Sequence, residues 1–238
     1  MRFDQSKFAE FYNRQQIQGG YPGKLLPFIL RELEGLHTVI DIGSGTGLIS
    51  IPLVSAGCKV TAVEPSVEMI TVMNRNTPAQ YRSSLKSFNI AWEKWSGNLH
   101  DAAIMVHSVY PMKDIRKAIE LMNFSAGKKI LIVRDTIKMK TLSSVIKKRL
   151  GLLLSRDLNH EIAGILDNIS PDWRIENIYE ERKHPVKSID DETDEIIYQL
   201  ELDDTYREKV TGILNEIICL DGHEFFFNAV FSDNAYIF

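Results

Sequence analysis

Three glycines at alternating positions follow an apolar run in the stretch VIDIGSGTGLIS, positions 39–50. Gly43, Gly45 and Gly47 lack Cβ atoms, so this turn can adopt positive φ angles and let a ligand approach the main chain closely. The residues that follow have a helical pattern, and the N-terminus of a helix offers free N–H groups and a partial positive charge. The stretch therefore predicts a turn between a strand and a helix that binds a ligand through its backbone.

Two carboxylates flank this turn and narrow the choice of ligand. Asp41 stands at the predicted end of the strand, where its charge would repel a diphosphate but suits an ammonium group. Glu64 ends the next predicted strand, 17 residues after Gly47, where an acid can accept hydrogen bonds from both hydroxyls of a ribose. We expect a ligand with a ribose diol, a cationic portion and no diphosphate. S-adenosylmethionine (SAM) has all three properties.

Two other nucleotide-binding motifs fit less well. A dinucleotide fingerprint, G-x-G-x-x-G, requires glycine at the position that Leu48 occupies. The chain has no G-x-x-x-x-G-K-[ST] sequence, which excludes a P-loop. A nicotinamide-dependent enzyme is thus disfavoured by the glycine spacing, and a strand–turn–helix without a ligand is the structural alternative.

The elements that must position these residues alternate along the chain. Short β-branched runs predict strands at HTVIDI, KVTAVE, SLKSFNI, DAAIMVH and GKKILIVRD, with helical patterns between them. WRIENIYEERKH and EFFFNAVFSDNAYIF predict further strands. We expect an α/β fold with a doubly wound, mostly parallel seven-stranded sheet and helices on both faces. We also expect one domain over 1–238, with a helical lid at 1–30, a SAM-binding core at 36–136, and a C-terminal half at 137–238 that contains a helical insertion at about 188–222.

The stretch from Val39 to Ile70, VIDIGSGTGLISIPLVSAGCKVTAVEPSVEMI, resembles the first two conserved motifs of class I SAM-dependent methyltransferases, a Rossmann-like superfamily. The resemblance continues less specifically to Asp135. It implies the methyltransferase fold and a methyl transfer that leaves S-adenosylhomocysteine. By this resemblance the cofactor-binding residues are Asp41, Gly43, Ser44, Gly45 and Gly47 at the methionine portion, Glu64 at the ribose, and Pro65, Ser66 and Met69 beside the adenosine.

The turn after the third predicted strand departs from the family pattern. In similar methyltransferases this turn often carries an acidic or polar residue near the adenine, whereas Ala91 occupies the matching position here. Trp92 offers an aromatic surface to the purine instead, and packing in the core is the equal alternative. We expect both residues at the cofactor site.

Polar residues also follow the fourth and fifth predicted strands, at the edge where open α/β sheets bind substrates. We expect His107 and Ser108 to contact the cofactor or substrate, and His107 and Tyr110 are the candidate catalytic residues, with a structural hydrogen-bonding role as the alternative for the histidine. Arg134 and Asp135 end the fifth strand, and their pairing with each other is the favoured interpretation.

The segment FAEFYNRQQIQGGYP predicts an amphipathic helix and a loop before the first strand. In similar methyltransferases such a segment closes over the cofactor. Tyr12 and Tyr21 are therefore candidate lid residues, and packing is an equally good interpretation of each.

Composition and charge exclude several classes of protein. The chain of 238 residues is 44% hydrophobic and 25% charged, with a net charge of −4 that argues against broad binding to nucleic acid. The cationic segment from Lys138 to Arg149 is interpreted as a solvated face. The two cysteines lack metal-ligand spacing, and the sequence shows neither a signal peptide nor a membrane span. We expect a cytoplasmic location, no membrane partner and no metal.

Absent motifs narrow the chemistry further. The tetrapeptide of amino-methylating DNA and protein-glutamine enzymes, a polar residue followed by two prolines and an aromatic, does not occur, and neither cysteine is placed as a nucleophile. Methyl transfer mainly requires alignment and exclusion of water, so it needs no fixed catalytic motif. We predict a methyltransferase for a small-molecule acceptor. An RNA or protein methyltransferase and a SAM-binding regulatory protein without transfer activity are the alternatives, and the accepting atom and oligomeric state are left open.

Overall fold

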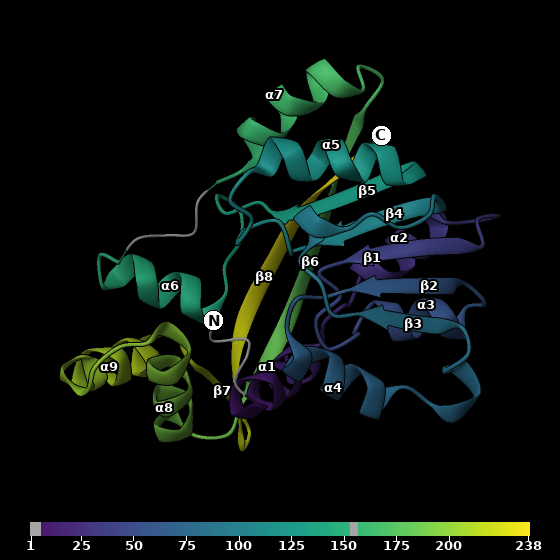
Figure 1. Ribbon diagram of the computed structural model, residues 1–238. Helices are drawn as coiled ribbons and strands as arrows, with labels where there is room; N and C mark the ends of the chain where they lie inside the picture. Colours follow the sequence, from purple (N-terminus) through teal and green to yellow (C-terminus); the bar gives the residue numbers. More distant parts are fainter. Residues whose placement is uncertain (1–5, 153–156) are drawn as a thin grey trace. The chain divides into compact units, whose positions relative to one another are not determined.

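The computed structural model describes residues 6–152 and 157–238 (Figure 1). The first half of the chain contains α1 (Ser6–Gln18), α2 (Leu25–Glu32), β1 (Thr38–Ile42), α3 (Ser50–Ser55), β2 (Lys59–Val63), α4 (Val67–Asn76), η2 (Ala79–Tyr81), β3 (Leu85–Phe88), η3 (Trp92–Lys94), β4 (His100–Val106), α5 (Ile115–Ser125) and β5 (Ala126–Arg134). The second half contains α6 (Leu142–Arg149), α7 (Asn159–Ile169), β6 (Arg174–Val186), α8 (Ile189–Leu200), η4 (Asp204–Tyr206), α9 (Arg207–Ile217), β7 (Cys219–Asp221) and β8 (Glu224–Ile237).

Within these described residues the strands form one eight-stranded sheet in the order β3-β2-β1-β4-β5-β8-β6, with β7 paired to β8 outside that order. The pairs β1–β2, β1–β4, β2–β3 and β4–β5 are parallel, whereas β8 is antiparallel to β5. The strand order reverses between β1 and β4, so a crevice is expected beyond the carboxyl ends of these two strands. The predicted doubly wound, mostly parallel sheet is confirmed, with the short β7 as an additional strand.

The chain divides into two compact units. Unit 1 comprises the described residues up to Arg134, together with 158–178 and 233–238, and unit 2 comprises the described residues of 135–157 and 179–232. Strands β6 and β8 each contribute residues to both units. The single domain over 1–238 stays a prediction, because compactness alone does not show whether the two units fold independently.

Apolar side chains cover both faces of the parallel strands in unit 1. Successive residues of a strand point to opposite faces, so Val39 belongs to one apolar layer whereas Ile40 and Ile42 belong to the other. The first layer includes Phe28 and Ile29 of α2 and Leu53 of α3, and the second includes Ile119 and Met122 of α5 and Ile162 and Leu166 of α7. These two layers fix the strand ends that carry the candidate site.

Unit 2 has an apolar cluster of its own, to which α6, α8, α9 and β8 contribute Ile146, Ile196, Val210, Leu214 and Phe227. The predicted helical insertion at 188–222 corresponds to α8 and α9 and ends in β7. Within the cationic segment from Lys138 to Arg149, Thr141 and Ser144 form a capping box, so α6 starts at Leu142. Residues 1–5 of the predicted lid lie outside the described residues, as do residues 153–156.

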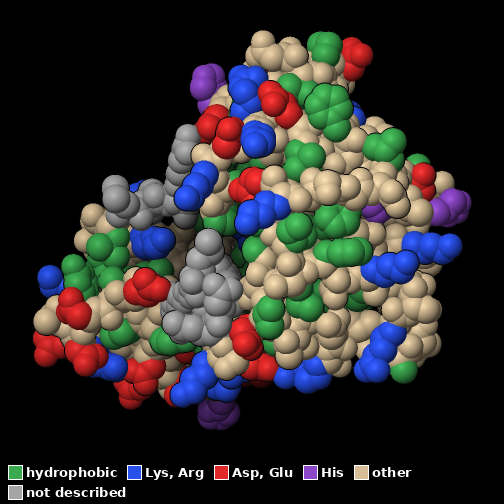
Figure 2. Space-filling model, in the orientation of Figure 1, with side chains coloured by type: hydrophobic (Ala, Val, Ile, Leu, Met, Phe, Trp, Pro, Cys, Tyr) green, Lys and Arg blue, Asp and Glu red, His purple; other side chains and the backbone are tan. Residues whose placement is uncertain are grey.

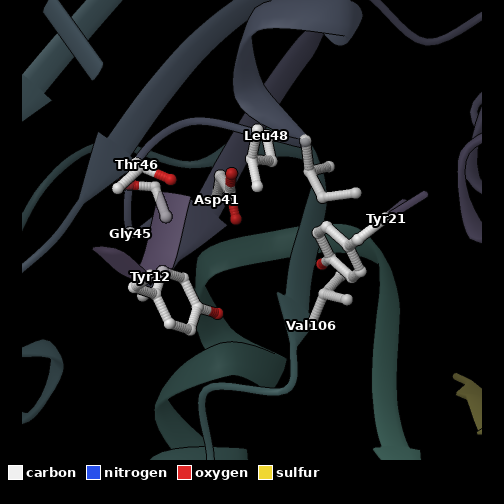
Figure 3. A pocket seen from close by; sticks show the side chains of 10 residues that line it. Tyr12, Tyr21, Asp41, Gly45, Thr46, Leu48 and Val106 are labelled. Carbon is white, nitrogen blue, oxygen red and sulfur yellow. The ribbon is translucent and has the colours of Figure 1, made fainter. Parts of the chain in front are cut away.

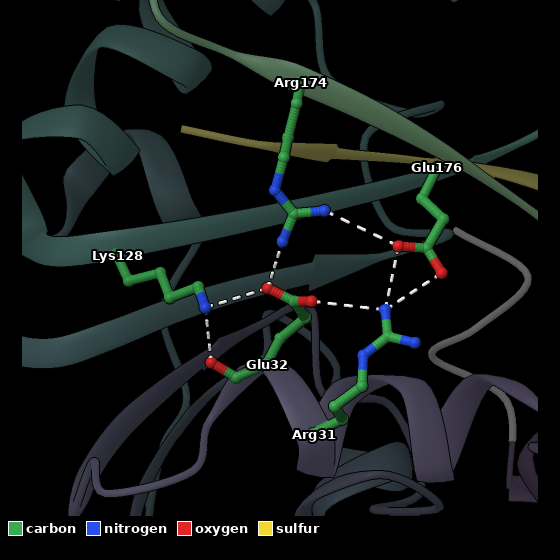
Figure 4. Close-up of polar contacts among 5 residues, drawn as sticks. All are labelled: Arg31, Glu32, Lys128, Arg174 and Glu176. Carbon is green, nitrogen blue, oxygen red and sulfur yellow. Dashed lines mark hydrogen bonds and ion pairs between the residues drawn. The ribbon is translucent and has the colours of Figure 1, made fainter.

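A charged cluster lies on α2, β5 and β6 within unit 1 (Figure 4). Glu32 is buried, and its carboxylate lies 2.8 Å from Lys128 Nζ, 3.2 Å from an Arg31 nitrogen and 2.5 Å from an Arg174 nitrogen. Burial would raise the pKa of Glu32, but the hydrogen bonds from Lys128 and Arg174 outweigh it and lower the pKa to about 2. The cluster therefore joins α2 to the sheet through a permanently charged carboxylate.

Candidate active site

A pocket with an empty volume of about 350 Å³, part of it open to solvent, lies at the carboxyl ends of β1 and β4. In Figure 3 the side chains of Tyr12, Tyr21 and Asp41 face the same space. The residues that line it are Tyr12, Tyr21, Asp41, Gly43, Ser44, Gly45, Thr46, Leu48, Ile49 and Val106. The structure thus brings the glycine turn, Asp41 and both candidate lid tyrosines to one cavity, at the crevice that the strand order predicts.

The glycine turn needs its bare backbone for two separate reasons. Gly43, Gly45 and Gly47 have φ angles of 71°, 55° and 82°, a region that side chains disfavour. A Cβ atom on Gly43 would also lie 2.3 Å from Ser108 Cβ, and one on Gly47 would lie 2.5 Å from Met73 Cγ. Ser108 itself is held because its hydroxyl donates to the Ile42 carbonyl. The turn is therefore packed against the loop after β4.

Alanine at position 43 is expected to cost roughly 2–4 kcal/mol of unfolding free energy, the sum of a positive-φ penalty and an overpacking penalty. Gly45→Ala is the matched control, because its φ is also positive but a Cβ there has no neighbour within 4 Å. That variant should lose only the roughly 1–2 kcal/mol of the φ penalty. Urea unfolding measures both values. Ser108→Gly should rescue part of the Gly43→Ala loss, and equal losses for the two alanine variants would refute the close approach to Ser108.

Glu64, directly after β2, stabilises the glycine turn through its carboxylate. Its Oε2 accepts a hydrogen bond from the Gly45 N–H at 2.9 Å, and its Oε1 accepts one from the Ser66 N–H at 2.9 Å. Each carboxylate oxygen has a second lone pair, so Glu64 can hold the turn and still accept from ligand hydroxyls. Glu64 therefore stabilises the glycine turn, a role that the sequence did not predict. Its contact with the ribose stays a prediction.

Asp41 is a buried carboxyl group at the floor of the pocket. Its Oδ2 accepts a hydrogen bond from the Ser50 hydroxyl at 2.5 Å. Burial raises the pKa of Asp41 to about 7, the Ser50 hydrogen bond opposes this, and the charge of Glu64 adds to it. Two neighbouring acids make the pocket electrostatically suited to a cation.

Two hydroxyl groups of the turn lack hydrogen-bond partners among the described residues. Ser44 Oγ and Thr46 Oγ1 are buried and have no hydrogen-bond partner within residues 6–152 and 157–238, although both residues line the pocket. Buried polar atoms are normally hydrogen-bonded, so these two are placed to bind a ligand. Thr46 was not among the predicted site residues, although it lies inside the glycine turn. Together with the acids and the bare backbone, these hydroxyls fit SAM.

The predicted adenosine neighbours also hold the start of α4. Ser66 caps this helix by accepting from the Met69 N–H at 3.3 Å, and Met69 is buried against residues of α1. Asn89, which the sequence did not single out, donates to the carbonyls of Glu64 and Pro65 at 3.2 and 2.8 Å. In the sequence, Asn89 stands out only as a turn-forming residue directly after a predicted strand. The adenosine contacts of Pro65, Ser66 and Met69 stay predictions.

Trp92 is a core residue. Only 3% of its surface is exposed, its indole N–H donates to the Ala118 carbonyl at 3.0 Å, and it packs in the layer that contains α5. Neither Ala91 nor Trp92 is among the residues that line the pocket. The structure favours packing as the role of Trp92, and contact of either residue with the purine stays a prediction.

Arg134 pairs with Asp233, and the expected Arg134–Asp135 pair is wrong. One Arg134 nitrogen lies 3.0 and 3.1 Å from the two Asp233 oxygens, whereas Asp135 accepts from Lys138 Nζ at 3.2 Å. Adjacent side chains along a strand point to opposite faces, and the register places Asp233 of β8 directly opposite Arg134 of β5. Sequence alone could not show this cross-strand neighbour.

His107 follows β4 beside this pair. Its Nε2 lies 3.6 Å from Asp233 Oδ1, and its ring centre is 6.1 Å from that of Tyr21. Burial, together with the charge of Arg134, holds the pKa of His107 well below its ordinary value. The side chain is therefore a neutral imidazole at neutral pH. Tyr110, the other candidate catalytic residue, is 37% exposed, and its hydroxyl accepts from the Arg134 N–H at 2.7 Å. Catalytic roles of both residues stay predictions.

The N-terminal segment reaches the pocket from α1. This helix packs on α4, where Glu10 forms a two-pronged ion pair with Arg75. Burial raises the pKa values of Tyr12 and Tyr21, so both phenols are neutral over the ordinary pH range. The segment lies at the pocket as predicted, and its closing over a cofactor stays a prediction.

Residues 40–123, about a third of the chain, match a family model described as a methyltransferase domain. The matched range contains the glycine turn, both pocket acids and His107. This part of the chain is thus similar to a methyltransferase domain, and the fold agrees with the resemblance seen in the sequence. Among curated protein sequences, none matches this chain.

Solved structures with this fold agree over most of the chain. One assigned as a methyltransferase from Bacillus halodurans has a TM-score of 0.61 at 8% identity and covers 90% of this chain and 98% of its own. Another, assigned to an antibiotic biosynthesis pathway of Anabaena variabilis, has a TM-score of 0.60 at 17% identity and covers 90% and 96%. The magnesium protoporphyrin IX methyltransferase of Synechocystis, with bound S-adenosylhomocysteine, has a TM-score of 0.51 at 17% identity and covers 93% and 82%.

Two features are absent from the described residues, 6–152 and 157–238. None of their helices combines the length and the apolar character required to cross a membrane. The same residues contain no group of three or more His, Cys, Asp or Glu side chains that could bind a metal.

Proposed function

We propose that the protein transfers the methyl group of SAM to a small-molecule acceptor. The observation that carries this proposal is the pocket itself, which is lined by the bare glycine turn, by Asp41 and by Ser44 and Thr46, whose hydroxyls have no hydrogen-bond partner among the described residues, while Glu64 bonds to the turn at Gly45. This combination suits a nucleoside with a cationic amino-acid portion and offers no cation for a diphosphate.

The residues present would hold the cofactor from three directions. Asp41 faces the ammonium group, Glu64 accepts from the ribose hydroxyls, and the hydroxyls of Ser44 and Thr46 bind polar atoms of the methionine portion. When bound, the cofactor supplies a methyl carbon that its sulfonium activates for in-line attack. Tyr12 and Tyr21 line the pocket, and their rings would exclude water from the methyl carbon when the cofactor is bound.

Two observations support a small acceptor. Tyr12 and Tyr21 of the N-terminal segment line the pocket, which suits a site that encloses a small substrate. On the face shown in Figure 2, both cationic and acidic side chains are exposed. Together with the net charge of −4, this mixture favours a small acceptor over a polymer such as RNA, which binds to cationic surfaces. We also propose a cytoplasmic location, which the free thiols of Cys58 and Cys219 support.

Calorimetry with SAM and S-adenosylhomocysteine tests the cofactor, and we expect both to bind. Transfer is then measured as S-adenosylhomocysteine release with a panel of phenol, amine, thiol and carboxylate acceptors. Salt-sensitive binding of RNA would favour the polymer alternative. Tight SAM binding without turnover on any acceptor would favour a regulatory protein, and absence of binding by both ligands would overturn the proposal.

A further inference from the structure

His107 has three features that packing alone does not explain. Its φ angle of 55° lies in the left-handed region, which is uncommon outside glycine and frequent at functional sites. Its ring is nearly buried, with 12% of the side chain exposed. Neither ring nitrogen has a hydrogen-bond partner in the described part of the chain. A buried imidazole without hydrogen-bond partners lowers stability, and such costs are typical of residues with a functional role.

Asp233 is the acid nearest to this imidazole. Its carboxylate is almost completely buried, with 3% of the side chain exposed, and Oδ1 lies 3.6 Å from His107 Nε2. That distance is slightly too long for a hydrogen bond, but a small rotation of the ring would close it. The acid thus lies where it can receive an Nε2–H proton donor.

The position of Asp233 is fixed from the β5 side. Arg134 contacts both of its carboxylate oxygens, and the two residues are partners in the β5–β8 register. The Arg134 backbone is itself held, because its N–H donates to the Tyr110 hydroxyl and its carbonyl accepts from the Asn159 amide at 3.0 Å. Hydrogen bonds of this kind hold the carboxylate of Asp233 in one orientation, as a positioning residue requires.

We propose that His107 takes the proton of the methyl acceptor and that Asp233, held by Arg134, is the positioning residue that orients its ring. The inference rests on the proposed function, because it concerns a residue that adjoins the same pocket. An Nε2–H group directed at Asp233 leaves Nδ1 as the bare nitrogen that can accept a proton. Val106 and Tyr21, which line the pocket, are the chain neighbour and the ring neighbour of His107.

The surroundings of the ring set its charge before and during the reaction. Arg134, Asp233 and Tyr21 lie near His107, and burial together with the charge of Arg134 holds the pKa of His107 well below its ordinary value, so the ring is neutral before the reaction. The same two factors disfavour the positive charge that a proton would create on the ring. The Asp233 carboxylate, 3.6 Å from Nε2, is the group that attracts this charge.

The transfer balances without a further reactant. A lone pair of the acceptor heteroatom forms the new bond to the methyl carbon, while the bond between that carbon and the sulfonium breaks and its electron pair returns to sulfur. The acceptor proton passes to Nδ1 of His107 and then to solvent. The site therefore takes acceptors that must lose a proton, namely hydroxyl, phenol or N–H groups, rather than tertiary amines or thioethers.

The tautomer of His107 can be measured without any acceptor. In ¹⁵N-histidine NMR spectra, the His107 signals are identified by their loss in His107→Gln, and we expect the neutral Nε2–H form at about pH 7. In Asp233→Asn, the new amide oxygen should stay paired with Arg134, which turns the amide NH₂ toward Nε2 of His107. The Nδ1–H tautomer should then replace the Nε2–H tautomer. Asp114→Asn is the control, because asparagine also caps α5 and should leave the tautomer unchanged.

Kinetics tests the proton transfer itself. With a hydroxyl, phenol or N–H acceptor, His107→Gln and Asp233→Asn should each lower kcat about 100-fold at neutral pH, with the Kd of SAM within about twofold of wild type. The deficit should shrink as pH rises, because the acceptor then ionises without a base. A purely structural role would give the same deficit at every pH.

The outcomes separate the two proposals. A His107 in the Nδ1–H form, a tautomer unchanged in Asp233→Asn, or a deficit independent of pH would overturn the inference. Failure of the wild-type protein to bind SAM would overturn the proposed function instead, while the tautomer would still report on the Asp233–His107 relation.

Discussion

Replacement of Glu64 by glutamine is expected to weaken the binding of SAM about a hundredfold, which corresponds to roughly 3 kcal/mol. The carboxylate accepts from the Gly45 and Ser66 N–H groups through different oxygens. Glutamine keeps one acceptor oxygen and directs its NH₂ group at the other N–H, so one bond becomes a contact between two donors. The variant therefore loses part of the proposed ribose contact and also a hydrogen bond that holds the glycine turn. Titration calorimetry measures the change.

Glu93→Gln is the matched control, because Glu93 is an exposed acid in η3. It should bind SAM as the wild type does. Urea unfolding of both variants separates a loss of affinity from a loss of fold. SAM binding by Glu64→Gln within about threefold of wild type would contradict both roles of the carboxylate.

The affinity for SAM is expected to rise with pH up to about pH 7 and then to level off. The pKa of Asp41 in the free protein is raised to about 7, so this acid is largely protonated below that pH and offers no charge to the ammonium group. Binding should therefore strengthen by up to about tenfold per pH unit below pH 7. Proton release, measured calorimetrically in two buffers of different ionisation enthalpy at about pH 6.5, should accompany it.

Asp41→Asn should remove this pH dependence and bind SAM about tenfold more weakly at pH 7.5, where the wild-type acid is charged. The same variant should be more stable than wild type at that pH. The folded pKa lies above the ordinary value of 3.8, so the contribution of Asp41 to stability is fully present below pH 3.8 and is lost as pH rises through about 7. A gain on the order of 2 kcal/mol is expected in urea unfolding. If the wild-type affinity for SAM does not change between about pH 5.5 and 7.5, ionisation of Asp41 is not linked to SAM binding.

The parallel half of the fold was predictable because its signals are local. Each strand is a short β-branched run, and each turn or helix start carries its own residues, such as the glycines before α3 and Ser66 before α4. The pocket acids were predictable for the same reason, since Asp41 and Glu64 stand at the ends of consecutive strands that pair in parallel.

The rest of the site depends on residues far apart in the sequence. Asp233 is 99 residues from Arg134, and only the antiparallel register of β5 and β8 makes them neighbours. Trp92 was ambiguous for a related reason. An aromatic residue after a strand can face a ligand or the core, and the nearby Ala118 carbonyl, 26 residues away, is what satisfies its N–H group. Pairing across distant strands is not encoded in any local pattern.

The long separation between Arg134 and Asp233 also sets an order of assembly during synthesis. A nascent chain that has reached the end of β5 already contains the glycine turn, both pocket acids and His107. It still lacks Asp233, which enters only when β8 has been made and has paired with β5. Such non-local strand pairing is slow because a long loop must close first. The cofactor half of the pocket can therefore form early in biogenesis, whereas the environment of His107 is completed among the last steps of folding.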